Sequence, residues 1–169
     1  MIAQIAMKMM EYFDGDVKRI NHAMKVYSFA KIVGQSEGLS GDYLFVLEAA
    51  ALLHDIGIKE CEKKYGNCNG TYQEAEGPPV ARKILKQFGI EKCIIDRICY
   101  LIGHHHSYDR IDDIEFQILV EADFIVNIFE DNIAPASIES INRKFVKTTT
   151  SKKLFESMYH VRMQVKQAI

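Results

Sequence analysis

Apolar residues recur at helical spacing along most of this chain, and the alternation that marks a strand is almost absent. The pattern predicts helices over residues 16–37, 40–53, 78–88, 91–103, 112–130 and 150–168, with a short segment that opens at Pro135. The polar, glycine-containing stretch 59–76 predicts a loop, and Pro78 and Pro79 suit the first turn of the helix that follows. We therefore expect one all-α domain over residues 1–169, a bundle of six or seven helices.

Composition and charge narrow the class of protein. With 169 residues, of which 48% are hydrophobic and 26% charged, the chain can form one domain with a substantial core. A net charge of −2 argues against a basic surface that binds nucleic acid polymers. No apolar run approaches the ~20 residues of a membrane span. No signal peptide is evident, so we expect a cytoplasmic monomer or homodimer whose four cysteines stay reduced.

The most informative polar residues are His54 and Asp55, which follow an apolar run and precede Gly57. An imidazole and a carboxylate are costly to bury side by side unless something pairs with them. A divalent transition metal binds both ligand types. On its own the pair could equally form a hydrogen-bonded cap at a buried helix end. Gly57 would then let the chain leave the helix sharply.

Other polar residues interrupt predicted buried faces. Asp123 lies in a strongly apolar helix, where an ionised carboxylate costs several kcal/mol unless it is paired or bound to a metal. Glu121, two residues earlier, should face elsewhere and be solvated or paired in a salt bridge. His22 lies beside an apolar stripe, and Arg19, one helical turn before it, could hold a phosphate.

Three consecutive histidines, His104, His105 and His106, follow the predicted helix 91–103. At most two of them can point into one site. The alternative is a polar helix end that reaches water.

In chain order these residues resemble the HD superfamily of metal-dependent phosphohydrolases, whose pattern is a histidine, a His-Asp pair and then an aspartate. The motifs Arg-x-x-His, Leu-Leu-His-Asp-Ile-Gly and Glu-Ala-Asp extend the resemblance, as does Gly77, which we expect to begin a helix. The resemblance covers residues 16–130 and leaves a C-terminal helical extension over 131–169. It implies an HD-domain-like bundle.

The resemblance also implies the site. One divalent metal (Mn, Fe, Co, Ni or Zn, with Mg as a further choice) would be held by the four ligands His22, His54, Asp55 and Asp123. Asp55 would be catalytic as well, because it lies beside the water to be activated. A second metal ion, or acid–base chemistry, would involve His104, His105 and Glu74. Arg19 and Lys59 would neutralise the phosphate. The reaction implied is hydrolysis of a small phosphomonoester, such as a nucleotide or another phosphorylated metabolite.

Departures from known branches leave the substrate open. The chain lacks the Gly-Tyr-Pro signature of cyclic-dinucleotide phosphodiesterases, and Glu74 stands where that branch has a histidine. Ile58 stands where small 5′-deoxynucleotidases carry a glutamate. Two other functions fit the same residues: a di-iron oxygenase on this fold, and a sensor that binds a metal or nucleotide without turnover.

Overall fold

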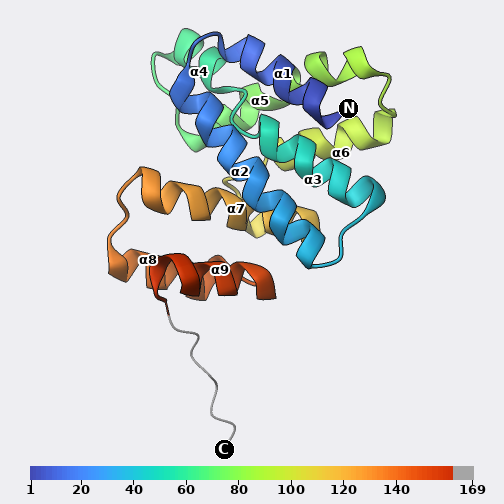
Figure 1. Ribbon diagram of the computed structural model, residues 1–169. Helices are drawn as coiled ribbons and strands as arrows, with labels where there is room; N and C mark the ends of the chain where they lie inside the picture. Colours follow the sequence, from blue (N-terminus) through green and yellow to red (C-terminus); the bar gives the residue numbers. More distant parts are fainter. Residues whose placement is uncertain (162–169) are drawn as a thin grey trace, which may run out of the picture.

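In the computed structural model, residues 1–161 are described, and every regular element among them is helical (Figure 1). The α-helices are α1 (Ile2–Phe13), α2 (Val17–Ser36), α3 (Gly41–Leu53), α4 (Ile58–Tyr65), α5 (Gly70–Leu85), α6 (Lys92–Ile102), α7 (Ile114–Glu130), α8 (Pro135–Phe145) and α9 (Thr149–Tyr159). Two short 3-10 helices, η1 (Lys86–Phe88) and η2 (Tyr108–Arg110), lie between them. The predicted all-α fold class is confirmed. The helices are more numerous than expected because residues 2–13 form α1 and the stretch 59–76 is largely helical.

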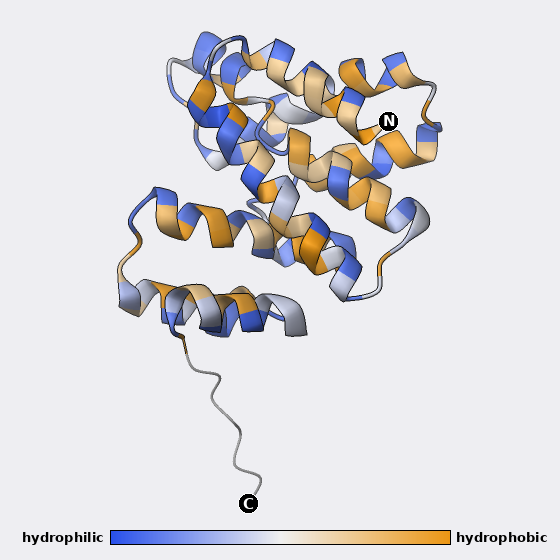
Figure 2. Cartoon of the chain, in the orientation of Figure 1, coloured by the Kyte–Doolittle hydropathy of each residue, from blue (hydrophilic) through white to orange (hydrophobic). Residues whose placement is uncertain are grey.

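The bundle has two hydrophobic cores. Helix α2 packs against both α3 and α7, α3 also contacts α6, and α5 lies against α6. These helices and α1 enclose the main core, in which residues 46–53 of α3 are all buried. Figure 2 shows hydrophobic residues spread along α3 and α7. Helices α8 and α9 form a separate layer beneath α7, with a smaller core around Phe155. Within residues 1–161, every helix is too short or too polar to cross a membrane.

The predicted loop over 59–76 is wrong. Helix α4 begins directly after the His54-Asp55 turn and ends at Gly66, which adopts a left-handed conformation with φ of 69°. Asn69 then caps α5, since its side chain accepts a hydrogen bond from the Tyr72 main-chain N–H. Only Cys61 of α4 is buried. Most residues of this short helix are charged, so its sequence resembles that of a polar loop.

The expected start of a helix at Gly77 and Pro78 is also wrong, because α5 begins at Gly70 and runs through these residues. A Cβ on Gly57 would lie 2.6 Å from the Gly77 main-chain nitrogen, so the turn after His54 and Asp55 touches the backbone of α5. A Cβ on Gly77 would lie 2.7 Å from the Ile102 side chain of α6. The two glycines thus permit a close crossing that seats the His-Asp turn between α5 and α6. Gly57 has φ of −73°, so its role is to leave space and not to supply an unusual backbone angle.

The last predicted helix, 150–168, is shorter in the structure. Thr148 caps α9 through a hydrogen bond from the Ser151 N–H, and the helix ends at Tyr159. Residues 160 and 161 are not helical. The remainder of the predicted range, 162–168, lies outside the described residues.

Candidate metal centre

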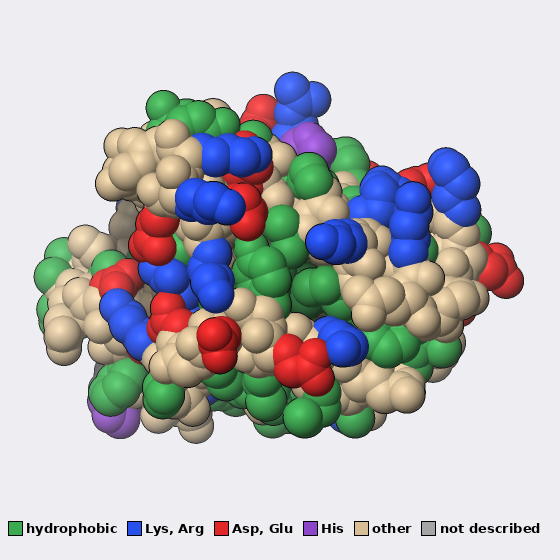
Figure 3. Space-filling model, turned by 90° about the horizontal axis from the view of Figure 1, so that it is seen from above, with side chains coloured by type: hydrophobic (Ala, Val, Ile, Leu, Met, Phe, Trp, Pro, Cys, Tyr) green, Lys and Arg blue, Asp and Glu red, His purple; other side chains and the backbone are tan. Residues whose placement is uncertain are grey.

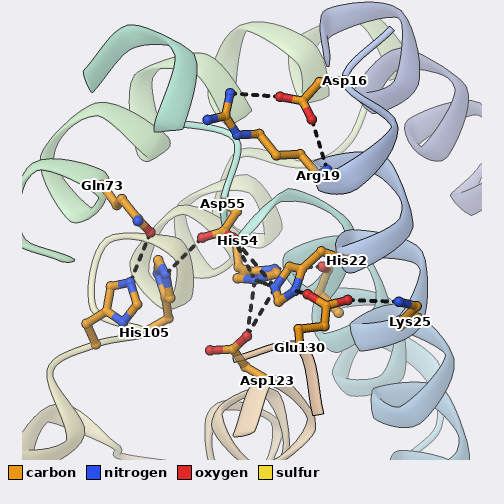
Figure 4. Close-up of polar contacts among 12 residues, drawn as sticks. Asp16, Arg19, His22, Lys25, His54, Asp55, Gln73, His105, Asp123 and Glu130 are labelled. Atoms are coloured by element: carbon orange, nitrogen blue, oxygen red, sulfur yellow. Dashed lines mark hydrogen bonds and ion pairs between the residues drawn. The ribbon is translucent and has the colours of Figure 1, made fainter. Parts of the chain in front are cut away.

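Helix α2, the end of α3 and helix α7 bring the four nominated metal ligands together (Figure 4). The Nε2 atoms of His22 and His54 are 3.1 Å apart. Asp123 Oδ1 lies 3.3 Å from the first of these nitrogens and 3.5 Å from the second. Asp55 Oδ2 lies 3.6 Å from both. Two imidazoles and two carboxylates therefore point at one small volume. Their binding of a metal stays a prediction.

The outer nitrogen of each imidazole has an acceptor that decides where its proton lies. His54 Nδ1 is 2.9 Å from the Ala51 carbonyl oxygen, and His22 Nδ1 is 2.9 Å from Glu130 Oε2. A carbonyl and an ionised carboxylate can only accept, so each Nδ1 carries a proton and donates it. In the neutral rings, the two Nε2 lone pairs then face each other.

This arrangement fits a cation. His54 is 1% exposed and His22 is 7% exposed, so water cannot easily satisfy the facing lone pairs. Asp123 Oδ1 is buried and has no hydrogen-bond donor among the described residues. Unpaired buried acceptors are costly, and a divalent metal that suits imidazole and carboxylate ligands would satisfy all of them at once.

The pKa values of these groups show how strongly they depend on one another. Burial lowers the pKa of His54, but the carboxylates of Asp55 and Asp123 outweigh it and raise that pKa to about 9. Burial raises the pKa of Asp55, but the imidazoles of His54 and His105 hold it at about 2. The pKa of Asp123 is lowered because the neighbouring imidazoles of His22 and His54 favour its ionised form by more than burial disfavours it. Without a metal, protons on the imidazoles thus partly compensate the carboxylates, and a metal must displace them.

A second group of candidate ligands shares Asp55 with the first. It consists of Asp55, His105 and His106, whose ligand atoms all lie within 4.8 Å of one another. His105 Nδ1 donates to the Ile102 carbonyl at 2.7 Å, and His105 Nε2 points at Asp55 Oδ1 across 3.6 Å. That nitrogen is buried and has no hydrogen-bond partner in residues 1–161. Asp55 therefore joins two ligand groups through its two oxygens.

The nomination of His104 needs correction, because the second group contains His106 in its place. His104 Nδ1 donates to the Tyr100 carbonyl at 2.8 Å, and its ring packs on the Tyr100 ring with centroids 4.4 Å apart. The turn after α6 directs His104 back along the helix and His105 and His106 inward. Gly70 leaves room for the His106 ring, since a Cβ there would lie 2.9 Å from it.

Glu74 also has a different position from the one expected of a metal ligand. One carboxylate oxygen accepts from the His106 main-chain N–H at 3.0 Å, and the other accepts from the Ser107 hydroxyl at 3.0 Å. Nearby, Gln73 Oε1 lies 3.0 Å from His106 Nε2. Glu74 thus holds the histidine turn against α5, and we do not place it in either ligand group.

The two cations nominated for phosphate binding already have protein partners. The Arg19 guanidinium pairs with Asp16 at 2.9 Å and with Glu62 of α4 at 2.5 Å. Lys59 Nζ donates to the Tyr12 carbonyl at 2.8 Å and lies 5.4 Å from the centre of the Tyr12 ring. Lys59 is therefore directed toward α1. A phosphate role for either residue stays a prediction and would require exchange of these partners.

Sequence reasoning missed one residue at the centre, Glu130. It contacts His22 from the end of α7, and its other oxygen accepts from Lys25 Nζ at 2.9 Å. Glu130 lies seven residues after Asp123, which is two helical turns, so both side chains project from the same face of α7. This spacing is the signal that could have revealed it.

A surface cavity of about 500 Å³ lies elsewhere, between α1, α4 and α5. Its apolar floor includes Val80 and Ile84, and its rim carries lysines and glutamates, as Figure 3 shows on this face of the molecule. None of the candidate metal ligands lines it. The cavity is therefore separate from the metal centre.

Comparison with known proteins agrees with this geometry. A family model described as the HD domain matches residues 19–128, which is more than half of the chain. No curated protein matches. A solved structure, described as a predicted HD superfamily hydrolase from an uncultured Thermotogales bacterium, is similar with a TM-score of 0.68 and 24% identity. The similarity covers 94% of this chain and 84% of that chain, and at this identity it shows a shared fold.

Proposed function

Because this chain belongs to the HD-domain family, we propose that it is a divalent-metal-dependent phosphohydrolase that cleaves a small phosphomonoester. One observation carries the proposal. Two imidazole nitrogens 3.1 Å apart face each other and Asp123 Oδ1, a buried oxygen with no hydrogen-bond donor among the described residues. Such a set of buried acceptors is the arrangement that a cation would complete.

His22, His54, Asp55 and Asp123 would hold the metal. A bound divalent cation would supply Lewis-acid activation of a water molecule and of a phosphoryl oxygen. Asp55 reaches both ligand groups, so its carboxylate can orient the attacking water and accept its proton. His105 Nε2 faces Asp55 and has no other protein partner in residues 1–161, so it can take up the proton that Asp55 accepts from the water and pass it to the leaving oxygen. Neither ligand group contains a cysteine, which favours Mn, Fe, Co, Ni or Zn bound by nitrogen and oxygen.

The test is a metal-reconstitution assay. The purified protein is stripped with a chelator, and Mn²⁺, Fe²⁺, Co²⁺, Ni²⁺, Zn²⁺ or Mg²⁺ is added back singly. Phosphate release is then followed with p-nitrophenyl phosphate and a panel of phosphorylated metabolites. We expect about one tightly bound ion per chain and metal-restored turnover, both lost in His54→Ala. Stoichiometric metal binding without phosphate release from any ester would favour the sensor function.

The sharing of Asp55 between two ligand groups also favours a second candidate, a di-iron oxygenase. A carboxylate with one oxygen in each group can bridge two ions. The distinguishing measurements are metal content after growth in iron-rich medium and oxygen consumption with candidate substrates. Two irons per chain with oxygen uptake and no phosphate release would replace the hydrolase proposal.

A further inference from the structure

We propose that Glu130 is a positioning residue that keeps the proton on His22 Nδ1 and so holds His22 Nε2 ready to bind the metal. The inference rests on the proposed metal-binding function and names a residue that raises the affinity of the site for the metal. Glu130 is not one of the clustered candidate ligands. It acts through the imidazole whose outer nitrogen lies 2.9 Å from its carboxylate.

The Glu130 carboxylate is held between two donors of helix α2. Its side chain is 14% exposed, and its two oxygens are divided between His22 Nδ1 and Lys25 Nζ, each at 2.9 Å (Figure 4). Lys25 lies on α2 one turn after His22, so both donors come from one face of that helix. The lysine neutralises the carboxylate and keeps it aimed at the imidazole. A charged acceptor also makes a stronger hydrogen bond than a neutral one.

His22 differs from His54 and His105 in the acceptor of its Nδ1 proton. His54 and His105 donate Nδ1–H to main-chain carbonyls three residues earlier, those of Ala51 and Ile102. Their tautomers are therefore set by the local turn of their own segment. His22 instead relies on a side chain 108 residues later in the sequence. Its tautomer depends on how α2 packs against α7.

The consequence is that α7 supplies both a ligand and the group that orients a ligand on another helix. Without Glu130, a neutral His22 ring can place its proton on either nitrogen. A proton on Nε2 would have to be removed before that atom could bind a metal. Loss of such an outer partner typically weakens metal binding by about 10–100-fold.

The test compares Glu130→Ala and Glu130→Gln with the unaltered protein. Affinity for Mn²⁺ and Zn²⁺ is measured by competition with a chelating dye. The His22 tautomer is read from imidazole ¹⁵N chemical shifts of the metal-free protein at alkaline pH. We expect Glu130→Ala to weaken metal binding by about 10–100-fold and to shift His22 toward the Nε2–H form. Glu130→Gln keeps an acceptor oxygen but loses the charge, so its affinity should fall between the two.

Glu121→Gln is the matched control, because it alters a buried glutamate of the same helix that makes no contact with the ligands. Its metal affinity should stay within twofold of the unaltered protein. A Glu130→Ala protein with unchanged affinity and an Nδ1–H His22 would overturn the inference. If the unaltered protein binds no metal, the proposed function fails instead, and the ¹⁵N tautomer still decides the role of Glu130.

Discussion

Two carboxylates of helix α7, those of Glu121 and Asp123, lie only two residues apart on different faces of the helix. They differ in their hydrogen-bond partners. Glu121 is fully buried, and one oxygen accepts from the main-chain N–H groups of Lys147 and Thr148 at 2.5 and 3.0 Å. The other oxygen accepts from the Thr148 hydroxyl at 2.5 Å. Asp123, on the face toward α2 and α3, has a buried oxygen with no donor in the described part of the chain.

The difference shows that burial of a carboxylate does not by itself indicate a metal. Glu121 was expected to be solvated or paired in a salt bridge, and that expectation is wrong. It ties the segment before α9 to α7, so its hydrogen bonds are complete and its function is structural. Asp123 lies in the same apolar helix, but its buried Oδ1 has no hydrogen-bond donor among the described residues. The informative feature is therefore a buried carboxylate oxygen that lacks a hydrogen-bond donor.

The largest expected effect comes from removing the carboxylate of Asp123, whose buried oxygen lacks a hydrogen-bond donor among the described residues. Asp123→Asn keeps the shape of the side chain but removes the charge that a cation would need. We expect bound metal and phosphate release to be lost together, with metal affinity falling by more than the roughly 10–100-fold that outer partners contribute. Elemental analysis and the p-nitrophenyl phosphate assay measure this. A variant that keeps its metal would exclude Asp123 as a ligand.

The complementary change should affect stability and leave the metal in place. Glu121→Ala removes the acceptor for two main-chain N–H groups and the Thr148 hydroxyl. An unsatisfied buried donor costs about 1–3 kcal/mol, so we expect a loss of about 3 kcal/mol. For a chain of this size the Tm should fall by about 6–12 °C. Thermal unfolding with metal content measured in parallel is the check, and loss of metal without a change in Tm would contradict the comparison.

The histidine turn offers a sharper test on the Asp123 side of the molecule. His106→Ala should lower the rate of phosphate release by about tenfold or more, because His106 belongs to the ligand group that shares Asp55. His104→Ala is the control, since His104 packs on Tyr100 outside that group. Its rate should stay within about twofold of the unaltered protein. Equal losses in the two variants would mean that the turn itself, and not the His106 ring, matters.

The smallest effect should appear on the C-terminal side at low pH. Hydrogen bonds from Thr150 at the start of α9 lower the pKa of Glu37. Since the folded pKa lies below the unfolded one, the stabilisation is present above the unfolded value of about 4.3 and is lost as the pH falls through the folded pKa. Glu37→Gln should remove this contribution, which is less than about 1 kcal/mol for a partly exposed group. Urea unfolding at pH 7 and at pH 3 would show a smaller difference in the variant.

The amino-acid sequence alone determined the helical class and a set of candidate metal ligands. Apolar residues at helical spacing identified α2, α3, α6 and α7, because each of these helices buries many of them. The order of His22, His54-Asp55 and Asp123 identified the family, since residue types and their spacing can be read from the sequence without knowledge of the fold. Helix α4 escaped notice because only Cys61 of it is buried.

Tertiary structure alone decided how those residues are arranged. The presence of His106, and not His104, in the second candidate ligand group depends on the direction of one turn, which adjacent identical residues cannot reveal. The roles of Glu121 and Glu130 depend on partners 27 and 108 residues away in the chain. The close contact of Gly57 with Gly77 is likewise visible only where the two segments meet. Local sequence specifies what a side chain can do, but its hydrogen-bond partners come from other helices, and those partners decide whether it packs, positions a ligand or binds one.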